Sequence, residues 1–301
     1  MAHILVTGVA TADYILDVAE YPREDAKVRA VARATLPGGN ATNTACVLAQ
    51  AGHRVDLAAT VAIGQEGEEL LSLVRARGVG TETCVRVPGR TPISHILRAR
   101  DTGSRTIVHF RDLPEVAAAD FRKLALSGYD WFHFEGRNPL ALPALLRAAR
   151  GAVVDSPLSL ELEKPGEGLD RALPFADVLL FSRSWVEANG ILDPEAFIQQ
   201  AARERGEQVQ TLTWGQRGAW IARGGEVWHC PPQAGLVVVD SVGAGDTFNA
   251  GLIDALSSGQ PPEQALASAV RLAERKLTQQ GLDDLFPPKH RGVATPGSAH
   301  E

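Results

Sequence analysis

The chain of 301 residues has little of what marks several large classes of protein. Its three cysteines, Cys46, Cys84 and Cys230, are odd in number and widely spaced, so they form neither a disulfide framework nor a CxxC metal site. No apolar run approaches the length of a transmembrane helix, and the first residues show no basic leader or cleavage signal. We therefore expect a cytoplasmic protein, because a reducing compartment suits free thiols.

Several motifs of enzymes and nucleotide-binding proteins are also missing. No GxxxxGK[ST] sequence occurs, which excludes a P-loop, and Gly78-Val79-Gly80 lacks the third glycine of a dinucleotide fingerprint. HExxH, GxSxG and clustered histidine or cysteine ligands do not occur either. The net charge is −6 with no long run of lysine or arginine, which argues against nucleic acid or an anionic membrane as the partner. A small molecule remains as the expected ligand.

The pattern of apolar segments predicts an α/β fold. After residue 130, strands alternate with helices, which is typical of a doubly wound, mostly parallel sheet flanked by helices. We expect strands at 131–134, 159–162, 178–181, 209–213 and 220–222, and helices at 140–150, 194–204, 250–257 and 263–277.

Two segments in the first third of the chain predict a small, separate β-sheet. Residues 11–18 alternate between polar and apolar side chains, and residues 27–34 have the composition of a strand. Residues 93–100 and 105–110 are expected to form a hairpin around Asp101-Thr102-Gly103-Ser104. The hairpin is half-exposed by pattern, as a lid or a dimer surface would be. We predict one domain over 1–286 with a β lid from about 11–35 and 92–112, and a disordered tail at 287–301.

The stretch from Val237 to Leu252 carries the strongest chemical signal. Three valines, 237–239, predict a strand, and a helix is expected by Thr247. Between them, Gly243-Ala244-Gly245 leaves backbone amides bare at the positive end of that helix, which favours an anion such as phosphate. Asp246 would repel phosphate unless it faces a hydroxyl to be deprotonated, so the arrangement suggests phosphoryl transfer to an alcohol. A purely structural glycine turn is the other interpretation.

A second polar edge lies near the N-terminus. Gly38-Gly39 precede a small-residue helix that carries Asn40 and Asn43 on one face of its first turn. Asn40 alone would be an N-cap, but two amides beside bare glycines suit a polyhydroxylated ligand, because each amide both donates and accepts hydrogen bonds. Asp13 follows the first strand, where α/β folds place ligand groups, although position alone favours a surface carboxylate.

Other polar residues follow strand ends, where the sequence allows both a role in a site and a purely structural role. Glu135 and Glu163 face the same crevice edge, and helix capping is the default for both. Trp214 to Gly218 either approaches a nucleotide through its backbone or forms a plain tight turn. Arg105 is a surface residue on position alone.

Two motifs together resemble the signatures of one family, the ribokinase-like (PfkB) carbohydrate kinases. These are Gly38 to Asn43 (GGNATN) and Asp240 to Phe248 (DSVGAGDTF), in which Ser241 stands where threonine is usual. Within the family the sequence is similar to the ketohexokinases over about residues 3–283. The family's Asn-x-x-Glu motif is not intact, because Ser184 replaces the asparagine while Glu187 remains, as in that subfamily. The resemblance therefore leaves the magnesium ligands unassigned.

The resemblance implies roles for particular residues. Asp246 would be the general base, and Gly243, Ala244 and Gly245 the anion hole. The sugar would be held by Asp13, Gly39, Asn40, Asn43 and Arg105, with Asp25 reaching in from the lid, as a partner subunit's residue in an interlocked homodimer. The adenine would lie against Gly218 and the segment Ala273 to Leu277.

The activity that the resemblance implies is transfer of the ATP γ-phosphoryl group to a ketose, converting fructose to fructose 1-phosphate. Mg²⁺ is the expected cofactor, and a monovalent cation such as K⁺ near Asp240 is common in the family. Ribose, a 2-keto-3-deoxy sugar acid, a sulfonated sugar or a nucleoside are alternative acceptors. A non-catalytic sugar- or nucleotide-binding protein and a scaffold are alternatives of other classes.

Overall fold

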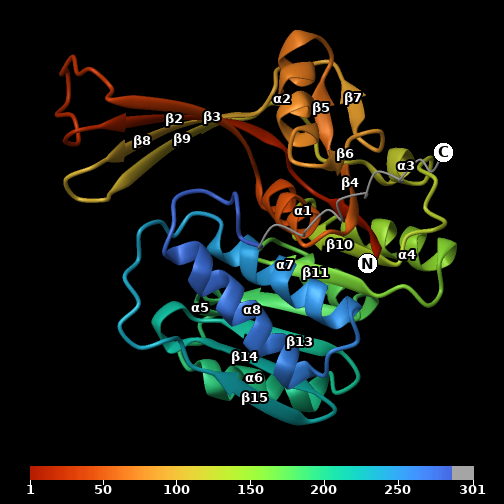
Figure 1. Cartoon of the computed structure of the whole chain (residues 1–301). Helices are drawn as coiled ribbons and strands as arrows, with labels where there is room; N and C mark the ends of the chain where they lie inside the picture. The colour runs from red at the N-terminus through yellow and green to blue at the C-terminus, as the bar shows by residue number, and fades with distance from the viewer. Residues whose placement is uncertain (287–301) are drawn as a thin grey trace, which may run out of the picture.

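The computed structural model describes residues 1–286, and the tail expected at 287–301 lies outside them. Its largest sheet has nine strands in the order β15-β14-β13-β12-β11-β10-β1-β4-β6 (Figure 1). All neighbours from β6 to β13 pair in parallel, and β14 and β15 are antiparallel. The strands are β1 (His3–Thr7), β4 (Arg54–Ala58), β6 (Val79–Gly80), β10 (Trp131–Glu135), β11 (Leu158–Leu162), β12 (Val178–Ser182), β13 (Val209–Thr213), β14 (Ala219–Arg223) and β15 (Glu226–Cys230).

Helices cover both faces of this sheet because successive strand residues point to opposite sides. Ile4 and Val6 of β1 join one apolar core, and Leu5 joins the other. The first core includes residues of α1 (Asn40–Gln50), α2 (Gln65–Arg75), α7 (Ala244–Ser257) and α8 (Pro262–Leu277). The second includes residues of α3 (Ala118–Phe121), α4 (Leu142–Ala152), η1 (Leu169–Phe175), α5 (Arg183–Ala188) and α6 (Pro194–Glu204). This confirms the predicted doubly wound, mostly parallel architecture.

A second sheet of four strands projects from the main body (Figure 1). Its order is β3-β2-β8-β9, with β2 and β8 parallel and the outer pairs antiparallel. The strands are β2 (Thr11–Val18), β3 (Ala32–Gly38), β8 (Ile93–Ala99) and β9 (Arg105–Phe110). A two-stranded ribbon of β5 (Thr60–Ala62) and β7 (Val85–Val87) lies near α2. The predicted hairpin is β8–β9, and the strand expected at 27–34 begins only at Ala32.

The segment before α7 differs from the sequence-based expectation. Val237, Val238 and Val239 form no strand, and their side chains are more than half exposed. The amide of Val239 donates to the Leu277 carbonyl at 2.7 Å, at the end of α8, so the backbone pairs with a helix end rather than a sheet. The helix begins at Ala244, three residues before Thr247. A β-branched run predicts a strand only where a neighbouring strand is available to pair with it.

Within residues 1–286, no helix is both long enough and apolar enough to cross a bilayer. The three cysteines are free, and Cys46 is buried.

Candidate functional site

Two hollows meet at the first turn of α7, at the carboxyl edge of the parallel strands. One is polar and open, with a cavity volume of about 360 Å³. The other is mostly apolar, with a cavity volume of about 230 Å³. The backbone of Ala244 and Gly245 forms part of the wall of both. A ligand in each hollow would therefore meet the other at the beginning of this helix.

The polar hollow brings together most of the residues predicted to bind substrate or act on it. They come from β2, α1, β9 and the start of α7, which are far apart in the sequence. The residues are Asp13, Gly39, Asn40, Asn43, Arg105, Gly243, Ala244, Gly245 and Asp246.

The start of α7 is built as the sequence suggests for an anion site. Gly243 caps the helix with a φ of 75°, a left-handed conformation that glycine adopts at little cost. The first amides of a helix have no acceptor inside it, so they point outward at the positive end of the helix dipole. The Ala244 amide donates over a long 3.4 Å to the Ser241 carbonyl. This leaves it loosely held and available to a better acceptor.

Asp246 lies at the bottom of the polar hollow and is only 6% exposed. Its Oδ2 accepts a hydrogen bond of 2.7 Å from Nδ2 of Asn43. Burial raises the pKa of Asp246 to about 7; the Asn43 hydrogen bond lowers it, and the charges of Glu135 and Glu163 raise it. A carboxylate with a pKa near neutrality is a better proton acceptor than an exposed one.

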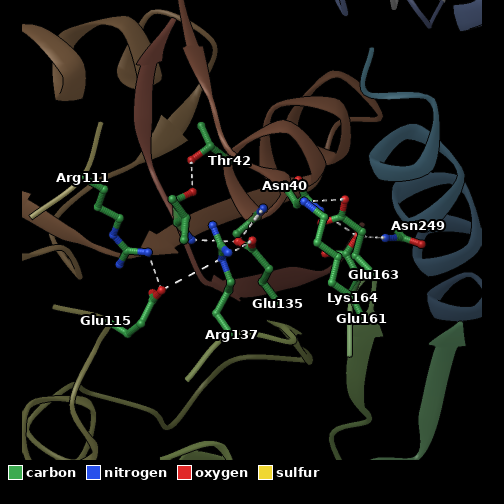
Figure 2. A network of polar contacts seen from close by, with 12 residues as sticks. Asn40, Thr42, Arg111, Glu115, Glu135, Arg137, Glu161, Glu163, Lys164 and Asn249 are labelled. Atoms are coloured by element: carbon green, nitrogen blue, oxygen red, sulfur yellow. Dashed lines mark hydrogen bonds and ion pairs between the residues drawn. The ribbon is translucent and has the colours of Figure 1, made fainter. Parts of the chain in front are cut away.

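Asn40 lines the polar hollow and does not cap a helix. Gly39 is the N-cap of α1, with a φ of 98° and no capping side chain. Nδ2 of Asn40 donates to Oε1 of Glu161 at 3.2 Å and to Oε2 of Glu163 at 3.1 Å (Figure 2). The capping interpretation of Asn40 is therefore wrong, and so is that of Glu163, which lines the hollow.

Glu161 is a buried carboxylate that the sequence did not single out as a site residue. It is the second-last residue of β11, lines the polar hollow as Asp246 does, and is 5% exposed. Oε1 also accepts from Nδ2 of Asn249 at 3.1 Å, whereas Oε2 has no hydrogen-bond partner among the described residues (Figure 2). The pKa of Glu161 is raised well above its usual range, mainly by burial and next by the charge of Asp246. This unpaired oxygen is itself buried.

Glu135 behaves as the expected helix cap. Its Oε2 accepts from the amides of Val9 at 2.8 Å and Ala41 at 3.3 Å, in the first turn of α1. Arg137 approaches Oε1 at 3.3 Å (Figure 2). Burial raises the pKa of Glu135 to about 7, although the hydrogen bonds from these amides and the charge of Arg137 lower it. The carboxylate thus ties the end of β1 to the beginning of α1.

Asp13 and Arg105 reach the hollow from the second sheet. Oδ1 of Asp13 accepts from Oγ1 of Thr11 at 2.9 Å, and burial raises the pKa of Asp13 despite hydrogen bonds from Ser94 and Thr11. Nη1 of Arg105 donates to Oγ of Ser241 at 2.9 Å, beside the anion hole. Asp13 is therefore not the plain surface residue that position alone favoured, whereas Arg105 is exposed as predicted, although it also lines the hollow.

The apolar hollow collects residues predicted to border the adenine, because Gly218, Ala273 and Leu277 all line it. Gly245, Phe248 and Val270 line it as well. Gly218 follows the short turn η2 (Gly215–Arg217), and a Cβ there would lie 2.2 Å from the Cys230 carbonyl oxygen. The segment is therefore both a tight turn and part of a wall.

Two of the residues discussed for the site lie away from both hollows. Asp25 lies in the connection between β2 and β3, toward the end of the projecting sheet (Figure 1). Glu187, from the altered Asn-x-x-Glu motif, pairs with Nε of Arg183 at 2.7 Å and lines neither hollow.

Glu161, Asn249 and Lys276 are the polar residues near the site that the sequence analysis missed. Lys276 is fully buried and donates from Nζ to Oδ2 of Asp240 at 2.8 Å. One signal was available: Glu161 lies inside a strand that is buried throughout, Leu158–Leu162, and Lys276 occupies a core-facing position of α8. A charged residue at a position that should be apolar is the informative exception.

Comparison with known proteins identifies the class to which this fold and site belong. The model of the "pfkB family carbohydrate kinase" matches residues 1–289. The ketohexokinase of Mus musculus is 32% identical over 293 residues, covering 94% of this chain and 98% of the relative.

Solved structures agree in fold. The ribokinase of Thermotoga maritima has a TM-score of 0.75 at 22% identity, covering 95% of this chain and 96% of the other. The phosphofructokinase-2 of Escherichia coli, in complex with potassium, has a TM-score of 0.77 at 19% identity and covers 94% of both chains. The chain belongs to the pfkB family of carbohydrate kinases. It is an enzyme of that class, as its sequence motifs predicted.

Proposed function

We propose that this kinase transfers the γ-phosphoryl group of ATP to a hydroxyl of a ketose, converting fructose to fructose 1-phosphate. One observation carries the proposal. A polar hollow with a buried carboxylate and an apolar hollow share the amide-bearing wall of Ala244 and Gly245. A sugar in the first and a nucleotide in the second would present hydroxyl and phosphate to each other at a helix N-terminus.

The mechanism rests on Asp246 and the start of α7. Asp246, held by Asn43, accepts the proton of the attacking hydroxyl as the bond to phosphorus forms and the bond to ADP breaks. The amides of Gly243, Ala244 and Gly245 and the helix dipole stabilise the charge on the transferred group. The transition state of phosphoryl transfer is loose, so positioning and charge stabilisation supply most of the rate.

Magnesium is proposed to accompany ATP. The described residues contain no group of three or more histidine, cysteine, aspartate or glutamate side chains arranged to hold a metal. Mg²⁺ in kinases is commonly bound by phosphates and one or two carboxylates, and Glu163, which lines the polar hollow, suits that role. When bound, it would neutralise charge on the phosphate oxygens.

The sugar-binding side is proposed to consist of Asp13, Gly39, Asn40, Asn43 and Arg105. Carboxylate, amide and guanidinium groups together offer both acceptors and donors, as a polyhydroxylated ligand requires. The choice of a ketose is supported by the mouse relative, which is named a ketohexokinase. Ribose, a 2-keto-3-deoxy sugar acid, a sulfonated sugar or a nucleoside would use the same hydrogen-bonding groups.

The second sheet is proposed to act as a lid and as the contact surface of a homodimer. Several of its large apolar side chains are exposed, and contiguous exposed apolar area marks interaction surfaces. On one face of the sheet they are Tyr14, Leu16, Val108 and Phe110. Asp25, distant from the hollow of its own chain, would then be supplied to the partner's sugar.

The experiment is Mg·ATP-dependent ADP release with a panel of ketoses, aldoses, keto acids and nucleosides. A preference for fructose with a 1-phosphate product by NMR supports the proposal. Turnover of another acceptor alone would keep the kinase but change the substrate. ATP binding without turnover of any acceptor would favour a non-catalytic binding protein.

A further inference from the structure

Lys276 is a fully buried cation behind the anion-hole loop. Its side chain is 0% exposed. Nζ donates to Oδ2 of Asp240 at 2.8 Å and to the Asp240 carbonyl oxygen at 3.0 Å, and it reaches the Gln279 carbonyl oxygen at 3.5 Å. The three donors of the ammonium group thus face three oxygens. Burying a charge is costly without such partners, so this arrangement is a specific one.

Asp240 connects the ammonium group to the anion hole. Its Oδ1 accepts from the Val242 amide at 2.9 Å, next to Gly243, and its Oδ2 accepts from the Gly281 amide at 3.1 Å. Burial raises the pKa of Asp240, but the hydrogen bonds from Lys276 and these amides outweigh it and lower the pKa. The carboxylate is therefore charged, and it fixes two loops relative to each other.

The oxygens around Nζ form the kind of site that a monovalent cation would use. A potassium ion carries the same charge as an ammonium group and is close to it in size. The family resemblance predicts K⁺ near Asp240, yet here Lys276 already uses a carboxylate oxygen and the carbonyl of that residue. Burial lowers the pKa of Lys276 although Asp240 raises it, and the positive charges of Arg105 and Arg98 nearby lower it further. A further cation would meet repulsion, so free K⁺ does not fit.

We propose that the Lys276 ammonium group is a built-in monovalent cation that positions the anion-hole loop, so that this kinase needs no K⁺. Lys276 is a positioning residue, because it acts on phosphate through Asp240 and Val242. The inference rests on the proposed phosphoryl transfer for its effect on turnover. Its effect on the folded loop does not depend on any substrate.

The first test uses the unaltered protein in choline chloride, NaCl and KCl at one ionic strength. We expect the same turnover, the same KM for ATP and the same melting temperature in all three salts. Turnover or melting temperature that rises specifically with K⁺ would overturn the proposal, because it would reveal a separate potassium site. The melting temperature decides the question even if none of the tested acceptors is phosphorylated.

The second test compares two substitutions with a matched control. Lys276→Ala leaves space for an ion, whereas Lys276→Met fills the space without a charge. In choline chloride both should lose on the order of 10²-fold in turnover, as when one oxyanion-hole donor is removed. KCl or NH4Cl should restore turnover to Lys276→Ala alone and raise its melting temperature, since an ion that binds the folded state stabilises it. Lys123→Met, at a side chain that is 75% exposed, should respond to no salt.

Two results would contradict this expectation. One is a Lys276→Ala variant with unaltered turnover and KM for ATP in choline chloride. The other is a folded Lys276→Ala variant whose turnover no monovalent cation restores. The positive charge of the amine would then not be what the loop requires. If both variants fail to fold, the salt series on the unaltered protein still decides.

Discussion

Asp246 and Glu161 are buried carboxylates that accept hydrogen bonds only from asparagine side chains among the described residues. Asn43 donates to Asp246, and Asn40 and Asn249 donate to Glu161. An amide stabilises a carboxylate less than a cation does, so burial dominates and both pKa values are raised. The negative charge of Glu135 raises both pKa values further.

The first prediction concerns the proposed base. Asp246→Asn should lose roughly 10²- to 10⁴-fold in turnover, the usual contribution of general base catalysis, and keep its melting temperature. Asp254→Asn is the matched control, because Asp254 lies on the same helix and contacts His53 away from both hollows. Steady-state kinetics and thermal unfolding measure both effects. Turnover of Asp246→Asn within a few-fold of the unaltered enzyme would refute the role.

The second prediction is the pH dependence of turnover. A base works when deprotonated, so turnover should fall as the pH drops through the Asp246 pKa of about 7. Glu163 contributes to that raised pKa through its negative charge. Glu163→Gln should therefore move the midpoint of the acid limb to lower pH.

Glu187→Gln is the control for this profile, since Glu187 pairs with Arg183 outside the hollows. Its pH profile should coincide with that of the unaltered enzyme. If the midpoint did not move in Glu163→Gln, or moved equally in the control, the fall in turnover at low pH would not report the titration of Asp246.

How far the sequence predicts single residues depends on whether their role is local. Asn40, Asn43 and Asp246 stand in short motifs whose spacing alone suggests hydroxyl and phosphate chemistry. Asn249, one turn of helix after Asp246, bonds Glu161, 88 residues earlier in the chain. Lys276 bonds Asp240, 36 residues earlier. Such pairs depend on how strands and helices pack, and no local pattern reveals them.

At the scale of secondary-structure elements, α7 begins with two glycines that meet different requirements. Gly243 has a φ of 75°, and a Cβ there would lie 2.9 Å from Cδ2 of Leu282. Gly245 has no heavy atom within 4 Å of the position its Cβ would take. The first glycine is required by the fold, whereas the second opens onto the wall between the hollows.

These differences predict opposite consequences of the same substitution. Gly243→Ala should lose about 1–2 kcal/mol of unfolding free energy from the left-handed backbone alone. Gly245→Ala should keep its stability but bind ATP more weakly, because the added methyl group occupies ligand space. Urea unfolding and calorimetric titration with ATP separate the two. A destabilised Gly245→Ala variant with unaltered ATP affinity would contradict this assignment.

Element boundaries follow the sequence wherever periodicity and packing agree. The strands at Thr11–Val18 and Val209–Thr213 and the helix at Pro194–Glu204 have the predicted limits. The valine run 237–239 forms no strand, and the Val239 amide instead donates to the Leu277 carbonyl at the end of α8. Pairing partners are a property of the whole fold, which a local propensity does not contain.

At the scale of the whole molecule, the projecting sheet predicts self-association. Val108 and Phe110 on β9 are 63% and 50% exposed, which is costly for an isolated chain in water. Sedimentation analysis should give twice the chain mass. The double substitution Val108→Asp and Phe110→Asp should give monomers with a raised KM for sugar, since each chain would lose the partner's Asp25.

Leu192→Asp is the control, because Leu192 is an equally apolar side chain, 76% exposed on the main body. It should sediment and turn over like the unaltered protein. A monomeric unaltered enzyme with full activity would show that each chain completes its own site.

The common wall of Ala244 and Gly245 has a consequence for the energetics of binding. A ligand bound in one hollow contacts these two residues and would thereby change the affinity of the other hollow for its ligand. By thermodynamic reciprocity, whatever factor sugar imposes on ATP affinity, ATP imposes on sugar affinity. Two residues of backbone thereby couple the two binding equilibria, with no moving domain required to transmit the effect.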